Sequence, residues 1–138
     1  MSEIQFSPIE KIETDKYIMK IDPVNQFMDY FIKPGIVFEA DDAVECKAKV
    51  VARYPDLKFY VLAGGIEFFT ITKKARELCA SREHLDNTHC VAFYTGNTSL
   101  FLLGELFNKI NKPPVPIKTF FNRFHAMEWL KTMMNRQQ

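Results

Sequence analysis

In the second half of the chain, short hydrophobic runs alternate with segments of helical periodicity. The apolar run Thr88–Thr95 has the length of a strand, and Leu100–Ile110 repeats its hydrophobic residues at helical spacing. Capping residues precede this helix, two prolines follow it, and a second strand-like run covers Val115–Phe121. Two parallel strands need a crossover of about a dozen residues or more, usually a helix. Residues 88–121 therefore predict a strand–helix–strand unit.

The first third of the chain is typical of antiparallel strands. Tyr17–Ile21 and Gln26–Ile32 are strand-like, and the Asp-Pro pair between them favours a turn, so we expect a hairpin. Residues 4–12 alternate loosely around Ile4, Phe6, Ile9 and Ile12. Pro8 argues against a central strand there, so this segment is either an edge strand or an arm.

Two helices and a buried strand follow the hairpin. We expect a helix capped by Asp41 or Asp42 that runs to about Tyr54. One face would hold Val44, Ala48 and Val51, and the other Glu45, Lys49 and Arg53. After its first residue, Lys58–Ala63 is a continuous apolar run, as in a strand covered on both faces, and Gly64-Gly65 predicts a tight turn with positive φ. Thr72 would cap a second helix, about Lys73 to Arg82, with Ala75, Leu78 and Cys79 buried.

The chain ends in another helix. We expect Asn122 to cap it and one face to be buried, formed by Ala126, Met127, Trp129, Leu130, Met133 and Met134. The complete pattern predicts one α/β domain over residues 1–138, with a mixed, mainly parallel sheet, an N-terminal antiparallel hairpin and about four flanking helices. Residues 1–14 would be an arm or edge strand, and residues 135–138 a frayed tail.

Composition and charge exclude several classes. Hydrophobic residues make up 47% of the chain and charged residues 25%, which is typical of globular proteins, and the net charge of +1 predicts no nucleic-acid partner. We see no stretch long enough to span a membrane and no secretory signal, so we expect a cytoplasmic protein. The spacing of metal ligands is not found among Cys46, Cys79 and Cys90, even when the histidines are included. We therefore expect the cysteines to pack as small apolar residues, and we expect no metal and no cofactor.

Catalytic motifs are missing from the sequence. There is no P-loop, dinucleotide fingerprint, nucleophile elbow or zinc-protease motif, so an enzyme is the weakest of the alternatives. The cluster Gly96, Asn97, Thr98 and Ser99 precedes a helix and follows a strand, where open α/β sheets bind ligands and where anions are favoured. A plain helix cap is the favoured interpretation of this cluster, and an anion or ligand site is the alternative.

Three stretches carry a family resemblance: Thr72–Ser81, Leu106–Phe121 and Ala126–Lys131. The most specific part is the spacing F-x-K-x-N-K-P-x-x-P-x-K-x-F followed by A-x-E-W-L. The pattern resembles small bacterial proteins of unknown function with a STAS-like fold, the architecture of anti-sigma-factor antagonists. The resemblance implies an αβ sandwich, usually without an assigned catalytic activity. This architecture is also similar to that of CRAL-TRIO-type lipid-transfer domains, which implies an apolar ligand as an alternative.

STAS regulators carry a phosphorylatable Ser or Thr at the start of the helix that follows the central strand. The matching region here is 63–72, where the acidic-Ser-Gly signature is absent and Thr70 and Thr72 are the candidates. A cap role explains Thr72, and phosphorylation of either threonine is the alternative.

The hydrophobic helix suggests a contact surface. Projected at 3.6 residues per turn, its leucines share one broad face, whereas Phe101 points the other way, toward Glu105 and Asn108. A phenylalanine in water forgoes roughly 1.5–3 kcal/mol of burial, so we expect either a partner surface or a neighbouring element to cover it. Phe68 and Phe69 would be a second part of such a surface.

These observations support two functional hypotheses. The first is a non-enzymatic interaction or regulatory module that contacts a protein partner or a second copy of itself, as a homodimer. The alternative is a carrier or sensor of a small apolar or amphipathic ligand. Its pocket would lie between the sheet and the helices, near residues such as Phe107, Met127 and Trp129.

Overall fold

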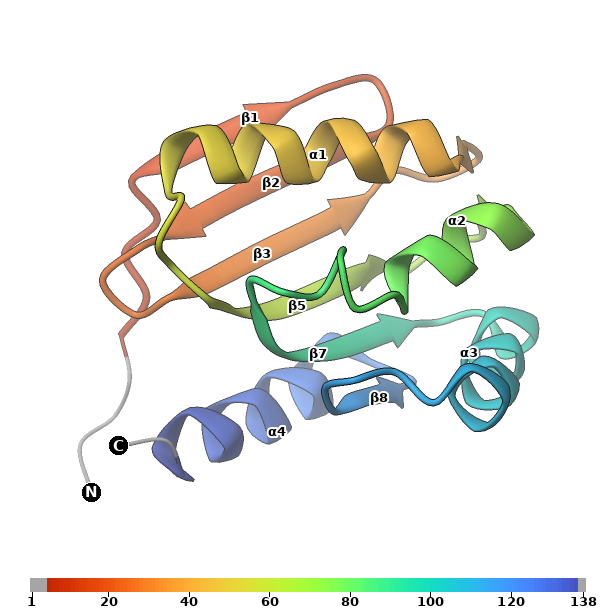
Figure 1. The fold of residues 1–138 in the computed structure, drawn as a ribbon. Coiled ribbons are helices and arrows are strands. Elements are labelled where there is room, and N and C mark those ends of the chain that lie inside the picture. Colours follow the sequence, from red (N-terminus) through yellow and green to blue (C-terminus); the bar gives the residue numbers. More distant parts are fainter. Residues whose placement is uncertain (1–4, 137–138) are drawn as a thin grey trace.

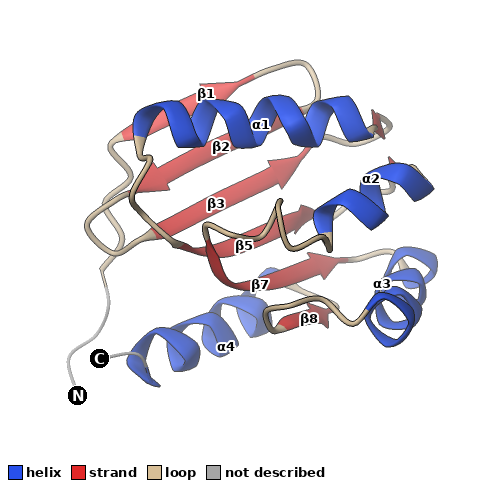
Figure 2. Ribbon diagram, viewed as in Figure 1, coloured by secondary structure: helices blue, strands red, loops and turns tan. Residues whose placement is uncertain are grey.

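The computed structural model describes residues 5–136, which are built around a six-stranded sheet (Figures 1 and 2). Its strand order is β1-β2-β3-β5-β7-β8. The bounds are Glu10–Glu13 (β1), Tyr17–Asp22 (β2), Phe27–Ile32 (β3), Phe59–Gly65 (β5), Thr88–Thr95 (β7) and Ile117–Phe120 (β8). The first three strands pair antiparallel, whereas β3, β5, β7 and β8 run parallel to their neighbours. The predicted mixed, mainly parallel sheet with an N-terminal hairpin is confirmed.

Four helices cover the sheet, and they divide unequally between its faces (Figure 1). They are α1 (Ala40–Arg53), α2 (Lys73–Cys79), α3 (Thr98–Asn111) and α4 (Arg123–Arg136). The helices α1, α2 and α3 form the crossovers between parallel strands, and because such crossovers are right-handed and the strands advance in one direction, all three lie on the same face. The helix α4 packs on the other face, against β5, β7 and β8.

Side chains of the parallel strands alternate between two cores. In β5, Val61 and Ala63 face the α1–α3 side, whereas Tyr60 and Leu62 face α4. The second core also contains Ala126, Leu130 and Met134 of α4, each almost fully buried, as the periodicity predicted. A strand buried on both faces explains the unbroken hydrophobic run at 59–63.

A second, two-stranded sheet was not predicted. The strands β4 (Val37–Phe38) and β6 (Thr70–Ile71) pair in parallel beside the main sheet. Two residues are too short to show a strand periodicity, so the sequence carries no signal for this pairing.

The predicted buried face of α1 is wrong. Val44 is 55% exposed, and the residues that face the sheet are Ala43, Cys46 and Val50. Both sets recur at helical spacing. The set with the smaller side chains, Ala43, Cys46 and Val50, lies inward because the sheet beneath it carries large side chains. One of these is Met19, whose sulfur is 3.7 Å from that of Cys46.

The start of α1 also differs from the prediction. The N-cap is Glu39, not Asp41 or Asp42. Asp42 lies at the third helical position, where its carboxylate accepts a hydrogen bond from the Glu39 backbone N–H at 2.8 Å.

Gly64 and Gly65 end strand β5 and do not form the predicted tight turn. Gly64 has the predicted positive φ, at 150°, and a Cβ there would lie 1.9 Å from the Tyr94 carbonyl oxygen of β7. A Cβ on Gly65 would lie 2.6 Å from the Ile32 carbonyl oxygen of β3. The pair therefore allows close approach of β5 to both of its neighbours.

Helix α2 ends three residues before the predicted Arg82. Thr72 is its N-cap, as predicted, and accepts a hydrogen bond from the Ala75 N–H at 3.2 Å. After Cys79 the chain turns, and the Ser81 hydroxyl donates to the Leu78 carbonyl at 2.6 Å, which satisfies a terminal carbonyl of the helix. In the predicted tail, α4 extends to Arg136, and residues 137 and 138 lie outside the described part of the chain.

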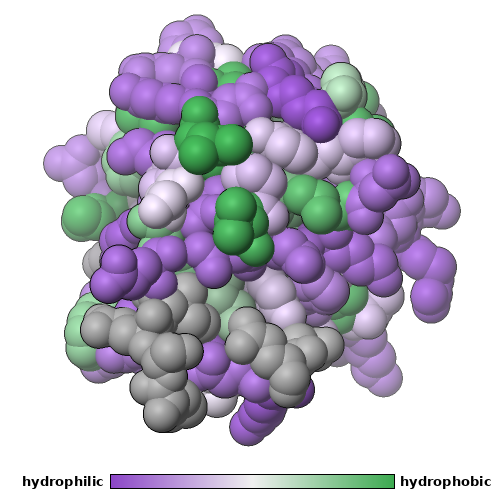
Figure 3. Space-filling view, turned by 90° about the vertical axis from the view of Figure 1, so that its left-hand side faces the viewer, coloured by the Kyte–Doolittle hydropathy of each residue, from purple (hydrophilic) through white to green (hydrophobic). Residues whose placement is uncertain are grey.

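The N-terminal segment contributes an edge strand at Glu10–Glu13, and Ile4 of the predicted segment lies outside the described residues. The β2–β3 turn is held by Asp22, which is 1% exposed. Its Oδ2 accepts hydrogen bonds from the Ser7 backbone N–H and from the Asn25 amide, both at 2.8 Å. The face of the molecule at this end is mostly hydrophilic, and its hydrophobic residues stand apart from one another (Figure 3).

Candidate functional site

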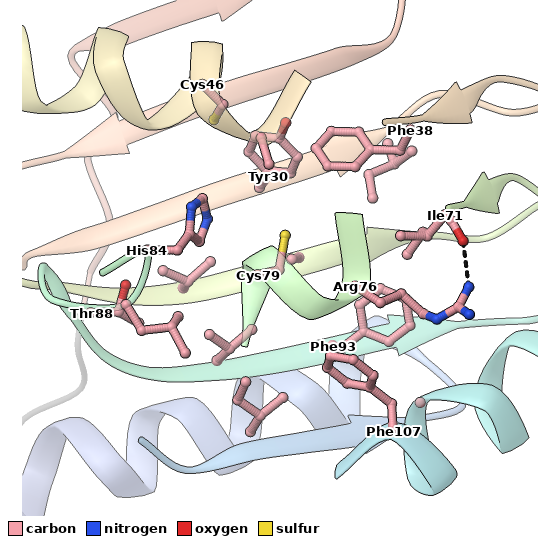
Figure 4. A pocket seen from close by; sticks show the side chains of 18 of the residues that line it. Tyr30, Phe38, Cys46, Ile71, Arg76, Cys79, His84, Thr88, Phe93 and Phe107 are labelled. Atoms are coloured by element: carbon pink, nitrogen blue, oxygen red, sulfur yellow. Dashed lines mark hydrogen bonds between the residues drawn. The ribbon is translucent and has the colours of Figure 1, made fainter. Parts of the chain in front are cut away.

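An apolar cavity lies between the sheet and the three helices on its α1–α3 face (Figure 4). Its volume is about 230 Å³. The floor consists of the side chains that β3, β5, β7 and β8 direct to this face, such as Val61, Ala63 and Phe93, and α3 adds Leu103 and Phe107. Most of the lining is carbon, so the cavity suits an apolar guest.

Tyr30 is a buried polar residue of the cavity lining. Its ring is held by a stacked contact with Tyr17, at 4.9 Å between centroids, and by an edge contact with Phe38 at 6.1 Å. The hydroxyl is buried beside the Cys46 thiol and has no oxygen or nitrogen partner among the described residues. Burial raises the pKa of Tyr30 far above its usual value, so the group stays a neutral hydroxyl that can donate and accept.

A second unpaired polar atom comes from α3. The Asn108 amide N–H₂ donates to the Ile117 carbonyl, which fixes the side chain, and its Oδ1 is buried without a partner among the described residues. Gly104, one turn earlier, allows α3 to approach β8, since a Cβ there would lie 3.0 Å from the Thr119 Oγ1. The inward face of α3 is therefore its Leu100, Leu103, Gly104, Phe107 and Asn108 side.

Titratable groups in the lining are either neutral or cationic. Burial raises the pKa of the Cys46 and Cys79 thiols to about 12, so both are protonated near neutral pH. Burial, together with the Lys47 ammonium, lowers the pKa of His84, which favours the uncharged imidazole. The two charged residues of the described lining are Lys47 and Arg76.

These two cations are compensated differently. The Lys47 Nζ lies 2.5 Å from Asp86 Oδ1 and 3.1 Å from the His84 carbonyl oxygen, so its charge is paired while it fastens α1 to the segment after α2. The Arg76 guanidinium donates to the Ile71 carbonyl at 2.6 Å, and no carboxylate of the described residues forms an ion pair with it. Figure 4 draws Arg76 and Ile71 at one end of the labelled side chains and His84 and Thr88 at the other.

Phe101 is covered by a neighbouring element of the same chain, which is one of the two predicted alternatives, and does not face outward for a partner. Its ring stacks on Phe121 with a centroid distance of 3.8 Å and an interplanar angle of 13°, and the residue is half-buried. The exposed apolar residues of α3 are instead Leu102, Leu106 and Ile110, which are 60%, 56% and 69% exposed. The helix is rotated about its axis relative to the prediction because the Gly104 side packs against β8.

The remaining predicted interface residues are scattered. Phe69 is fully buried and makes an edge contact with Phe93, so it is not available to a partner. Phe68 is 53% exposed. Glu105 is half-buried, and Asn108 lines the cavity.

The loop 96–99 caps α3. The Asn97 Oδ1 accepts a hydrogen bond from the Leu100 N–H at 3.1 Å, and the Thr95 hydroxyl accepts one from the Asn97 N–H at 3.1 Å. Thr98 and Ser99 are exposed, and Gly96 packs against the Ile66 carbonyl. The cap interpretation accounts for the loop, and these residues are not part of the cavity lining.

The two candidate phosphorylation residues differ in accessibility. Thr72 is half-buried, and its hydroxyl is engaged as the cap of α2. Thr70, in β6, is exposed. Modification of Thr70 or Thr72 stays a prediction.

The proposed pocket residues separate into two groups. Phe107 lines the cavity, as predicted, whereas Met127 and Trp129 lie on α4 and pack on the opposite face of the sheet. The sequence placed these residues on helices but did not indicate which face each helix covers. The residues that it missed, Tyr30 and Arg76, have no local signal, because only the fold brings them to one cavity.

Other kinds of site find no support within residues 5–136. No helix in this range combines the length and hydrophobicity needed to cross a bilayer. No cluster of three or more His, Cys, Asp or Glu side chains in this range could hold a metal ion.

A family model described as "Domain of unknown function (DUF7793)" matches residues 23–134. The chain belongs to this family. A search of curated proteins found no match. Among solved structures, the chain is similar to an uncharacterized protein of the DUF3478 family with a SpoIIAA-like fold, from Shewanella loihica. The TM-score is 0.57 at 12% identity, over 94% of this chain and 98% of that one. At this identity the likeness shows the fold alone, and it agrees with the STAS-like architecture that the family resemblance implied.

Proposed function

We propose that this DUF7793-family protein binds a small, mainly apolar ligand in the cavity beneath α1, α2 and α3, as a carrier or sensor. The observation that supports this most is the combination of a 230 Å³ apolar cavity with a buried Tyr30 hydroxyl that has no oxygen or nitrogen partner among the described residues. A buried polar atom without a partner costs about 1–3 kcal/mol. The hydroxyl has almost no accessible surface while the cavity is empty, so a ligand would remove this cost only through a shift of the Tyr30 side chain.

The cavity volume limits the size of the ligand. An apolar protein cavity of about 150 Å³ accepts benzene, with its six carbon atoms. Scaled by volume, the 230 Å³ here accommodates about nine or ten non-hydrogen atoms. A single short alkyl chain or one substituted ring fits this limit, whereas a two-chain lipid does not.

The two unpaired polar atoms indicate what the ligand carries besides carbon. The Asn108 Oδ1 can only accept a hydrogen bond, whereas the Tyr30 hydroxyl can donate or accept. Both atoms have almost no accessible surface in the empty cavity, so a ligand with one polar group among apolar atoms would satisfy either of them only after a shift of the side chain.

The test uses octanamide, a neutral probe with ten non-hydrogen atoms, and a variant that fills the cavity. We expect octanamide to bind the wild-type protein in calorimetry, and Ala63→Leu, which adds three carbons to the cavity floor, to weaken binding at least tenfold. The control Ala48→Leu makes the same change at an exposed position of α1 and should leave binding unchanged. Wild-type protein that does not bind octanamide, or equal binding by Ala63→Leu, would reject the proposal. Native mass spectrometry of freshly purified protein checks independently for a co-purified ligand.

A second candidate function rests on the outer face of α3. Leu102, Leu106 and Ile110 recur every four residues and are all more than half exposed, which is unusual for three neighbouring residues of one helix. The occupant we propose is a second copy of the chain, which would make a homodimer, and a regulatory role in a bacterial cytoplasm would act through this contact.

Light scattering tests this contact. We expect a dimer that becomes a monomer on Leu106→Asp, whereas the control Val44→Asp, at an exposed position of α1, leaves it intact. A wild-type monomer at high micromolar concentration would reject the homodimer.

A further inference from the structure

The charge of the cavity lining is one-sided. Its 26 residues include two cations, Lys47 and Arg76, and no aspartate or glutamate, and the described histidine and cysteine side chains in it are neutral. Lys47 is neutralised by Asp86. The remaining net charge of the lining is the guanidinium of Arg76.

Arg76 has unused hydrogen-bonding capacity. A guanidinium carries five N–H donors, and the hydrogen bond to the Ile71 carbonyl uses one nitrogen. The partner is a neutral carbonyl, so the bond orients the group without cancelling its charge. The planar fork of an arginine matches the two oxygens of a carboxylate or phosphate.

We infer that the ligand is an anionic amphiphile whose short apolar tail fills the cavity and whose negative headgroup pairs with Arg76. This inference rests on the proposed function and specifies its ligand class. The position of Arg76 at one end of the cavity, beside Ile71, lets a single-chain molecule place its head at the guanidinium and its tail among Val61, Phe93 and Leu103 (Figure 4). The absence of an acidic side chain from the described lining leaves nothing to repel the head.

Arg76 also has a structural role that must be separated from ligand recognition. It lies in the last turn of α2 and fastens that helix to β6 through Ile71. A purely structural arginine would affect neutral and anionic ligands alike. Discrimination by ligand charge is therefore the decisive measurement.

The experiment compares octanoate with octanamide, which has the same number of non-hydrogen atoms and no charge, by calorimetry at pH 7 and low salt. We expect octanoate to bind about tenfold more tightly than octanamide to the wild-type protein, because charge-assisted hydrogen bonds are about twice as strong as neutral ones. In Arg76→Gln the ratio of the two affinities should fall to about one, whatever the change in octanamide affinity itself, and Arg76→Lys should keep most of the preference. Octyl phosphate, measured in parallel, distinguishes a phosphate from a carboxylate headgroup.

The control is Arg82→Gln, which removes the same charge from an exposed position outside the lining and should not change the preference. Equal binding of octanoate and octanamide to the wild-type protein overturns the inference but leaves the proposed function standing. A preference for anions that survives in Arg76→Gln overturns it as well. If none of the probes binds, the proposed function itself fails.

Discussion

Replacing Tyr30 by phenylalanine should make the ligand-free protein more stable. The substitution removes only the hydroxyl, which has no oxygen or nitrogen partner among the described residues, and keeps the ring contacts with Tyr17 and Phe38. Burial of a hydroxyl without a hydrogen bond costs about 1–3 kcal/mol. The neighbouring Cys46 thiol is a weak hydrogen-bond partner of the hydroxyl and offsets part of this unfavourable free energy. We therefore expect the free energy of unfolding to rise by about 1 kcal/mol.

The assay is urea and thermal unfolding of protein shown by native mass spectrometry to carry no ligand. For a chain of this length, about 1 kcal/mol corresponds to a rise in Tm of roughly 3–5 °C. The matched control is Tyr17→Phe, because the Tyr17 hydroxyl accepts a hydrogen bond from Lys49 Nζ at 3.3 Å. That variant should be neutral or slightly less stable. A loss of 1 kcal/mol or more in Tyr30→Phe would mean that the hydroxyl has a partner in the folded protein, and the polar anchor of the proposed site would be refuted.

Three further predictions concern the scaffold. Burial alone would raise the pKa of Asp22, but hydrogen bonds from Asn25 and Ser7 outweigh it and lower the pKa, so the carboxylate stabilises the fold fully above the ordinary value of 3.8 and this stabilisation is lost as the pH falls through the folded-state pKa. Urea unfolding at pH 7 and pH 3 should therefore show a smaller loss of stability at pH 3 in Asp22→Asn than in wild type, and equal losses would contradict this. Gly64→Ala should destabilise the protein by about 3 kcal/mol or more, because its Cβ would lie 1.9 Å from the Tyr94 carbonyl oxygen; wild-type stability in urea would show that β5 can move away. Leu130→Ala should cost about 2–5 kcal/mol in the same assay, because this side chain is fully buried under the sheet, and a cost below 1 kcal/mol would show that α4 is not packed there.

The sequence predicted the sheet well because its strands carry strong local signals. The unit from Thr88 to Phe121 combines an apolar run with the length of a strand, a helix cap at Asn97 and two prolines after the helix, and each of these signals acts over a few residues. Parallel pairing of β5, β7 and β8 then follows from the lengths of the crossovers. The turn at Asp22 was predicted for the same local reason.

The rotation of each helix about its axis could not be predicted in this way. In α1 two sets of residues recur at helical spacing, and the set with Val44 and Val51 is the more hydrophobic. The large side chains of the sheet nevertheless leave room only for the smaller Ala43 and Cys46 on the inward face. In α3 the hydrophobic residues cover more than half of the circumference, so some must be exposed, and the close packing of Gly104 on Thr119 decides which. A glycine within a hydrophobic helix was the one sequence signal for that inner face.

The candidate site was harder to predict than the fold. Tyr30 and Arg76 are more than 40 residues apart and follow no motif, so their common cavity appears only after β3 and α2 are placed. The sequence suggested a pocket between sheet and helices but assigned α4 to it, although α4 covers the other face.

The most direct measurement is an NMR experiment that records intermolecular NOEs between bound octanamide and the methyl groups of the protein. The account predicts NOEs from the alkyl chain to Val61, Leu103 and Ile117, which line the cavity on the α1–α3 face. NOEs confined to Leu102, Leu106 and Ile110 on the outer side of α3, or to Leu130 of α4 on the other face of the sheet, would contradict it.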